Sequence, residues 1–164
     1  MRYVVCAALT LTVLSSAPAS GALISTSPSV VCSYLNDSGL RTRGWKNYYG
    51  SEYGCSSPYR ELGTGYPLAN NLAFYAEGTG SEVTSTKLVL NVNNRGTAEA
   101  AKNELLKAAK LLSVKAAGGE LPQSVQDAIS AGEGATASVG SVSVEVLRID
   151  WPTGKGYEIK VILE

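Results

Sequence analysis

The sequence predicts a single α+β domain, built on one antiparallel sheet of about four strands with two to three helices on one face. Three observations support this class. Segments with alternating apolar residues occur as pairs joined by turn sequences, as in hairpins. The segment 97–117 has apolar residues at helical spacing. Helices and strands follow one another in runs rather than in strict alternation. The expected order is helix, loop, strand, strand, helix, helix, strand, strand.

The length and the N-terminus define the expected domain. The chain has 164 residues, of which 45% are apolar, and this suits one domain with a buried core. Residues 1–22 have the pattern of a secretory signal peptide, with Arg2, an apolar run from Val4 to Leu14, and small residues that allow cleavage near 19–22. The run is shorter than the roughly 20 apolar residues that span a bilayer. We therefore expect residues 23–164 to form a periplasmic or secreted domain without stable membrane insertion.

The charge balance excludes one class of partner. Loss of Arg2 with the signal peptide leaves one more acidic than basic side chain. Proteins that bind nucleic acids through phosphates need an excess of Lys and Arg. We therefore expect no nucleic-acid partner.

Two cysteines, Cys32 and Cys55, follow the signal peptide. An exported chain passes through an oxidising compartment, where such a pair forms a disulfide. A bridge over this span contributes about 3 kcal/mol in the loop-closure description. The alternative is two free buried thiols. A metal site is not expected, because the chain has no His and two thiolates do not complete a zinc shell.

The first part of the domain is expected to be a short helix followed by a long loop. The helix runs from about Pro28 to Asn36, with Ser27 before it and Gly39 after it. Residues 40–70 are rich in Gly, Ser, Asn and Pro, and their apolar residues fit neither the helical nor the strand period. This segment is predicted to be a loop held to the first helix by the disulfide.

The remaining elements follow from periodicity. Strands are expected at 71–77 and 86–93 and again at 141–151 and 156–164, each pair forming a hairpin. In the third strand the apolar positions change phase after Val146, which predicts a β-bulge.

Two helices are expected between these hairpins. The first begins after Thr97 and continues to residue 117, and a second begins at Pro122 and ends before Gly132. Residues 132–140 are expected to be a loop.

No catalytic constellation is visible. The absence of His excludes the usual triads, and no G-x-S-x-G or S-x-x-K motif follows the signal peptide. The turn at 154–156 does not fit a phosphate loop, because Ile149 stands where that motif needs Gly. The acids Glu52 and Glu61 are the only carboxylate pair near candidate sugar-stacking rings, but solvated loop acids explain both more simply. We expect no enzyme and no cofactor.

The segment from Gly44 to Tyr66 is the candidate binding surface. It contains one Trp and five Tyr in an otherwise aromatic-poor chain. Tyr and Trp mixed with Ser, Gly and Asn are typical of recognition surfaces. The alternative is a loop that packs its own rings down. We expect Trp45 and Tyr59 to point mostly inward and Tyr48, Tyr49 and Tyr53 mostly outward. The candidate residues are Arg43, Trp45, Lys46, Tyr48, Tyr49, Tyr53 and Tyr59.

The strings GWKNYYGSEYGCSSPYRELGTGYPLANNLAFY, LVLNVN and DWPTGKGYE resemble those of an uncharacterised family of small exported bacterial proteins. The resemblance extends from about residue 31 to 163. It implies a Gram-negative origin and a periplasmic location, and it implies no activity or ligand.

Two functional hypotheses remain. The first is an exported, non-enzymatic binding module that contacts a protein partner through the aromatic segment. The second is an envelope-glycan binder, or a weak glycan hydrolase with Glu52 or Glu61 as acids, that uses the same rings. A third possibility is that the helix at 97–117 forms a dimer.

Overall fold

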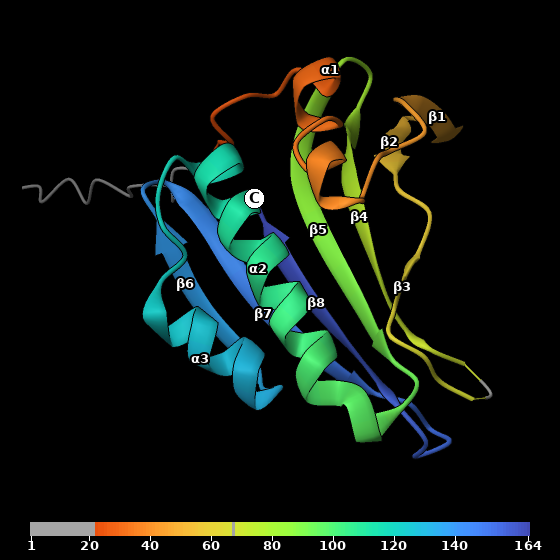
Figure 1. The fold of residues 1–164 in the computed structure, drawn as a ribbon. Coiled ribbons are helices and arrows are strands. Elements are labelled where there is room, and N and C mark those ends of the chain that lie inside the picture. Colours follow the sequence, from red (N-terminus) through yellow and green to blue (C-terminus); the bar gives the residue numbers. More distant parts are fainter. Residues whose placement is uncertain (1–21, 67) are drawn as a thin grey trace, which may run out of the picture.

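The computed structural model describes residues 22–66 and 68–164. The predicted signal peptide therefore lies, apart from its last residue, outside the described residues. The described residues form a single α+β domain with one antiparallel sheet of eight strands and three α-helices on one face of that sheet (Figure 1). The predicted fold class is confirmed, whereas the predicted four strands and their order are wrong.

The helices and strands have the following bounds. The α-helices are α1 (Pro28–Val31), α2 (Ala98–Ala117) and α3 (Gln123–Ala131), with 3-10 turns η1 (Asn36–Ser38) and η2 (Arg95–Thr97). The strands are β1 (Lys46–Tyr49), β2 (Glu52–Ser56), β3 (Arg60–Leu62), β4 (Asn70–Thr79), β5 (Glu82–Val92), β6 (Ala135–Val139), β7 (Val142–Asp150) and β8 (Tyr157–Leu163).

The order of strands across the sheet is β1-β2-β4-β5-β8-β7-β6, and β3 also pairs with β4. Strands β2 and β3 lie one after the other along the same edge of β4, because β2 pairs with residues 75–79 and β3 with residues 70–72. The central strands β4, β5 and β8 are the apolar runs that the sequence predicted.

The additional strands lie in two segments that were predicted to be loops. The segment 40–70 contains β1, β2 and β3, and the segment 132–140 contains β6. Strand β1 is exposed along its whole length, so no buried alternation marks it. The first helix is also shorter than predicted, since α1 ends at Val31, residues 32–35 form turns, and η1 follows at 36–38.

The core lies between the helices and the sheet. Helix α2 packs against β4, β5 and β8, and α3 packs against β6 and β7. Burial of these apolar side chains is the main stabilising contribution, at roughly 25 cal/mol per Å² removed from water. The largest fully buried side chains are Phe74, Leu35, Leu40, Leu72, Leu88, Leu90, Leu105, Leu112, Ile129, Ile159, Leu163 and Val31.

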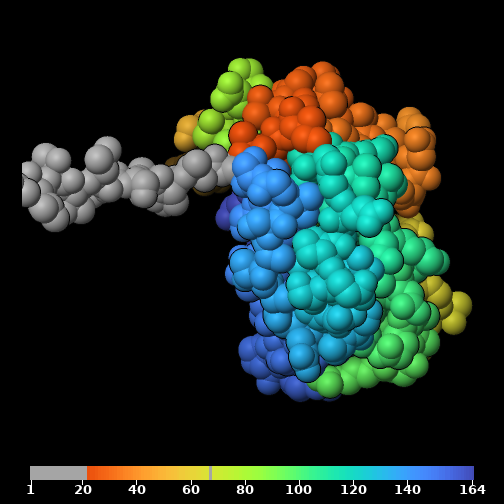
Figure 2. Space-filling view, turned by 90° about the vertical axis from the view of Figure 1, so that its left-hand side faces the viewer, coloured from red at the N-terminus to blue at the C-terminus, as the bar shows by residue number. Residues whose placement is uncertain are grey.

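A buried lysine joins the two long helices, which lie next to each other in Figure 2. Lys102 on α2 is 6% exposed. Its ammonium group donates to the carbonyl of Ser130 near the end of α3 and lies 2.6 Å from the carboxylate of Glu99. The last carbonyls of a helix carry partial negative charge, so a cation at this position stabilises α3.

The predicted β-bulge in the third hairpin strand is wrong. Strand β7 pairs with β8 without a shift in register from Val144 to Asp150. Alternation continues through Val146, and the next position on that face is Arg148, whose guanidinium lies 4.0 Å from the ring centre of Tyr157. The apolar pattern changes phase because an arginine occupies a helix-side position, while Leu147 and Ile149 point to the other face.

The disulfide between Cys32 and Cys55 is present and joins the end of α1 to β2. The N-terminal segment also contacts α2, since the amide of Ile24 donates to the carbonyl of Ala116 and Lys115 donates to the carbonyl of Tyr34. Figure 2 shows this segment, in red, across the end of α2. The upper end of the core is therefore closed by a short helix, a bridge and a strand.

Candidate functional site: the open face of the sheet

The three helices lie on one face of the sheet (Figure 1). The opposite face, here called the open face, carries polar and aromatic side chains. In β4, β5 and β8, alternate residues point away from the core and are mostly half-buried. Cross-strand pairs order this face, including Lys87 with Glu77 at 2.7 Å and Asn91 with Asn71 at 2.9 Å. No helix of the described residues covers it.

Four hydroxyl-bearing residues form a continuous group on one half of the open face. The hydroxyl of Tyr48 lies 3.3 Å from that of Ser56, and Ser56 pairs across the strands with Tyr75. The hydroxyl of Tyr75 donates to that of Tyr59 at 3.1 Å. We call Tyr48, Ser56, Tyr59 and Tyr75 the tyrosine cluster.

Two lysines flank this cluster. The ammonium of Lys46 lies 5.1 Å from the ring centre of Tyr48, and that of Lys87 lies 5.3 Å from the ring centre of Tyr75. Such cation–π contacts fix the rings without covering both of their faces. About half of the surface of Tyr48 and Tyr59 remains exposed, at 51% and 48%.

Glycine in β2 allows Tyr48 to lie flat against the sheet. A Cβ atom at Gly54 would lie 2.9 Å from the ring of Tyr48 and 2.8 Å from the carbonyl of Ala76. Any larger residue at this position would push the ring away from the strand. Gly54 therefore determines the position of the first ring of the cluster.

A buried serine positions the second ring. Ser57, 6% exposed, lies between β2 and β3. Its amide donates to the carbonyl of Phe74, and its hydroxyl accepts from the amide of Phe74 at 2.9 Å. The side chain thus completes the pairing where β2 ends, and Pro58, which has no N–H, follows it. The connection brings Tyr59 beside Tyr75.

The environment of Tyr75 changes its titration. Burial, followed by the hydrogen bond to Tyr59 and the nearby acids Glu158 and Glu77, raises the pKa of Tyr75 well above its ordinary value. The phenol is therefore neutral at every pH where the protein is expected to work. It serves as a hydrogen-bond donor rather than as a base.

The predicted binding residues do not all lie on the open face of the sheet. Trp45 and Tyr53 stack with ring centres 6.3 Å apart, and the indole of Trp45 donates to the carbonyl of Gly80 at 2.8 Å. Trp45 packs against the core as predicted, whereas the expected inward position of Tyr59 is wrong and Tyr53 is only half-exposed. Tyr49 is 82% exposed at the turn between β1 and β2. Lys46 and Tyr48 join Tyr59 on the open face, and the exposed Arg43 lies outside the tyrosine cluster.

Three residues of the site, Ser56, Tyr75 and Lys87, were not among the predicted ones. Tyr75 and Lys87 lie on β4 and β5, where they pair directly across the strands. The alternation in these two strands already placed both on the polar face. Only the pairing of β2 with β4 shows that this polar face continues into the aromatic segment.

The carboxylate pair considered for glycan hydrolysis is widely separated. Glu52 pairs with Thr79 and Glu61 pairs with Asn71, eight positions apart on the same strand. At a rise of roughly 3.3 Å per residue the two backbones lie about 26 Å apart. Glycosidase carboxylates act at separations of roughly 5–9.5 Å. Glu52 and Glu61 therefore do not form such a pair.

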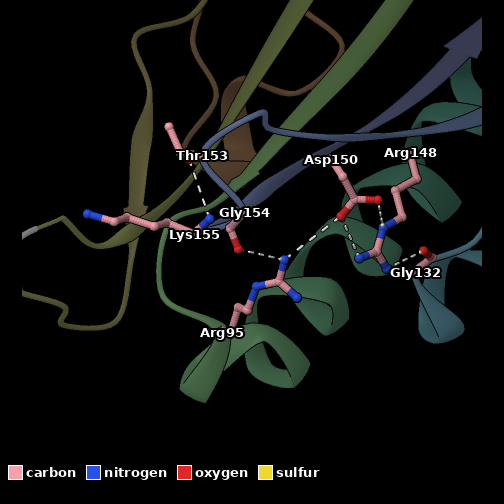
Figure 3. Close-up of polar contacts among 7 residues, drawn as sticks. All are labelled: Arg95, Gly132, Arg148, Asp150, Thr153, Gly154 and Lys155. Atoms are coloured by element: carbon pink, nitrogen blue, oxygen red, sulfur yellow. Dashed lines mark hydrogen bonds and ion pairs between the residues drawn. The ribbon is translucent and has the colours of Figure 1, made fainter.

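A second polar cluster lies where β7 ends and β8 begins (Figure 3). Arg148 donates to both carboxylate oxygens of Asp150 and to the carbonyl of Gly132, and Arg95 donates to the carbonyl of Gly154. Both guanidiniums lie over the buried ring of Tyr157. The hydrogen bonds from Arg148 lower the pKa of Asp150. These groups form hydrogen bonds with one another, so few of their donors and acceptors remain for a ligand. The cluster joins β7 to α3 and η2.

The described residues contain no group of three or more His, Cys, Asp or Glu side chains that could hold a metal ion. No helix of the described residues is long and apolar enough to cross a membrane.

Comparison with known proteins gives a match to a family model. The model of a family of unknown function, DUF6030, matches residues 18–148. This confirms the expectation of an uncharacterised family. No curated protein and no solved structure matches the chain.

Proposed function

The chain belongs to DUF6030, a family of unknown function, and we propose that it is an exported, non-enzymatic binding module. The module contacts a protein partner through the open face, with the tyrosine cluster at the centre of the contact. The proposal extends the surface predicted from the aromatic segment to Tyr75 and Lys87 on the neighbouring strands.

The observation that carries this proposal is the one-sided placement of the helices. They bury the apolar face of the sheet, while Tyr48 and Tyr59 remain about half-exposed on the other face. Tyrosine gives a large contact area and a hydrogen-bonding group at low cost in side-chain entropy. The rings are already held by hydrogen bonds and by lysines. A partner therefore meets a surface that needs little reordering.

Export is part of the proposal. Residues 1–22 have the signal-peptide pattern, and the Cys32–Cys55 disulfide suits an oxidising compartment. We place the protein in the periplasm or outside the cell after cleavage near residues 19–22.

An envelope glycan is the second candidate ligand. The half-exposed rings of Tyr48 and Tyr59 favour it, because flat ring faces offer the apolar side of a sugar a surface to lie on. This candidate concerns binding alone, since Glu52 and Glu61 are too far apart to hydrolyse a glycan.

Affinity capture with matched variants tests the proposal. Tagged protein without residues 1–22 is incubated with periplasmic extract of cells that carry it naturally. The affinity of each captured protein for wild type is then compared with its affinity for Tyr48→Ala and Tyr59→Ala. We expect each change to weaken binding at least tenfold, as for ring truncations near the centre of an interface. Tyr66→Ala is the control, because Tyr66 is 97% exposed outside the cluster.

The result also separates the two ligands. Retention on purified peptidoglycan or on a glycan array that is lost in the same two variants would replace the protein partner by a glycan. Binding that is unchanged in both variants would contradict a role for the tyrosine cluster.

A further inference from the structure

A depression of about 440 Å³ next to the tyrosine cluster is bordered by three arginines. Its volume lies in the range of small-molecule sites, at roughly 300–1,000 Å³. We call it the arginine depression. Its lining residues are Gly39, Arg41, Thr42, Arg43, Pro58, Tyr59 and Arg60, and none of them is acidic.

Two of its three arginines have no acidic partner. Among the described residues, neither Arg41 nor Arg43 takes part in an ion pair. Arg60 lies 3.2 Å from Glu104, but Glu104 also lies 2.7 Å from Lys107. One carboxylate thus serves two cations, and the depression has an excess of about two positive charges.

Arg60 also has hydrogen-bonding capacity that the protein does not use. Its Nε atom is buried and has no partner among the described residues. The stem of the side chain lies against Gly39, where a Cβ atom would be 3.1 Å from Cδ of Arg60. A buried donor without a partner is unusual in native proteins.

We propose that the arginine depression binds a phosphate monoester. A phosphate monoester carries a charge of about −1.5 to −2 at neutral pH, which matches the excess positive charge. Guanidinium groups bind phosphate oxygens with two parallel hydrogen bonds, which gives both strength and orientation. The half-exposed ring of Tyr59 at the edge of the depression contacts the group that bears the phosphate.

This site shares Tyr59 with the proposed protein contact, but its charged groups are separate from that contact. It borders the open face at Tyr59, and its binding residues Arg41 and Arg43 lie outside the tyrosine cluster. Loss of one activity therefore need not remove the other.

The test is a titration monitored by amide chemical shifts in ¹⁵N-labelled protein without residues 1–22. The ligands are inorganic phosphate, glucose 6-phosphate and, as the uncharged control, glucose. We expect both phosphates to give saturable shifts centred on residues 41–43 and 58–60, and glucose to give none. Binding should weaken when the pH falls below about 6, where phosphate loses its second charge, and when salt is added.

Variants establish which groups bind. Arg41→Gln and Arg43→Gln should each weaken phosphate binding about tenfold, as expected for loss of a charge-assisted hydrogen bond. Both side chains are exposed, so the fold should be unaffected. Lys155→Gln, which removes one exposed positive charge elsewhere, should leave binding unchanged.

Two further arms distinguish the source of the phosphate. Tighter binding of glucose 6-phosphate than of inorganic phosphate supports a sugar phosphate. Binding to phosphatidylcholine vesicles that contain phosphatidic acid, and not to phosphatidylcholine alone, supports a lipid headgroup. The proposal is overturned if no saturable shift occurs with either soluble phosphate, or if Lys155→Gln weakens binding as much as Arg43→Gln.

Discussion

The hydroxyl of Ser57 stabilises the edge of β4 through one buried hydrogen bond. It accepts the amide of Phe74 at the point where β2 gives way to β3, and both residues are buried. Ser57→Ala would leave that amide without a partner. A buried unsatisfied group costs about 1–3 kcal/mol. We expect the free energy of unfolding to fall by about this amount, as measured by urea denaturation.

The control for this prediction is Ser51→Ala. Ser51 is exposed in the turn between β1 and β2, and such surface changes stay within about 0.5 kcal/mol. Equal stability of the two variants would show that the hydroxyl of Ser57 does not complete the pairing of β4.

The raised pKa of Tyr75 predicts that the protein loses stability at alkaline pH. Its pKa is raised in the folded protein, chiefly by burial, so the folded state retains this proton more strongly than the unfolded state. Its contribution to stability is therefore complete below the unfolded pKa of about 10 and is lost as the pH rises above it. Burial also raises the pKa of Tyr34, in the same direction. The free energy of unfolding should decline above pH 10.

The Tyr75→Phe variant measures how much the phenol of Tyr75 contributes to this decline in stability. The decline above pH 10 should become shallower in this variant and should not vanish, because Tyr34 still titrates. A decline as steep as that of wild type would show that the phenol of Tyr75 is not buried against Tyr59.

At the element scale, the disulfide holds α1 to β2. It closes a loop with a sequence separation of 23 residues. In the loop-closure description such a bridge contributes about 3 kcal/mol. We expect the Cys32→Ala/Cys55→Ala variant to lose about this much stability in chemical denaturation. Hydrogen exchange should increase most in α1 and β2, while α2 remains protected. Faster exchange spread evenly over the domain would contradict a local role of the bridge.

The sequence identified some elements better than others for physical reasons. Helix α2 was predicted closely because its one-sided packing gives a clear helical period. Strands β1 and β3 were missed because one is fully exposed and the other has three residues. The bulge assigned to β7 was wrong because Arg148 packs on Tyr157 at a position where an apolar residue would keep the pattern.

At the scale of the whole molecule, the sequence predicts the aromatic segment as a binding surface but does not predict which strand residues lie beside it. The segment supplied Tyr48 and Tyr59, and its cysteine predicted the bridge. Which ring lies on which face depends on pairing between β2 and β4, and sequence periodicity carries no such information. The same long-range pairing brings Tyr75 into the site. The division into a helix-covered face and an open face is therefore a property of the assembled sheet.

Site-specific photo-crosslinking tests the central claim most directly. A photoreactive phenylalanine analogue replaces Tyr48 on the open face or Val114, 52% exposed on α2, in cells that carry the protein naturally. We predict a crosslinked species of defined mass from position 48 and none from position 114. Crosslinks from position 114 alone would place the partner on the helices and contradict the account.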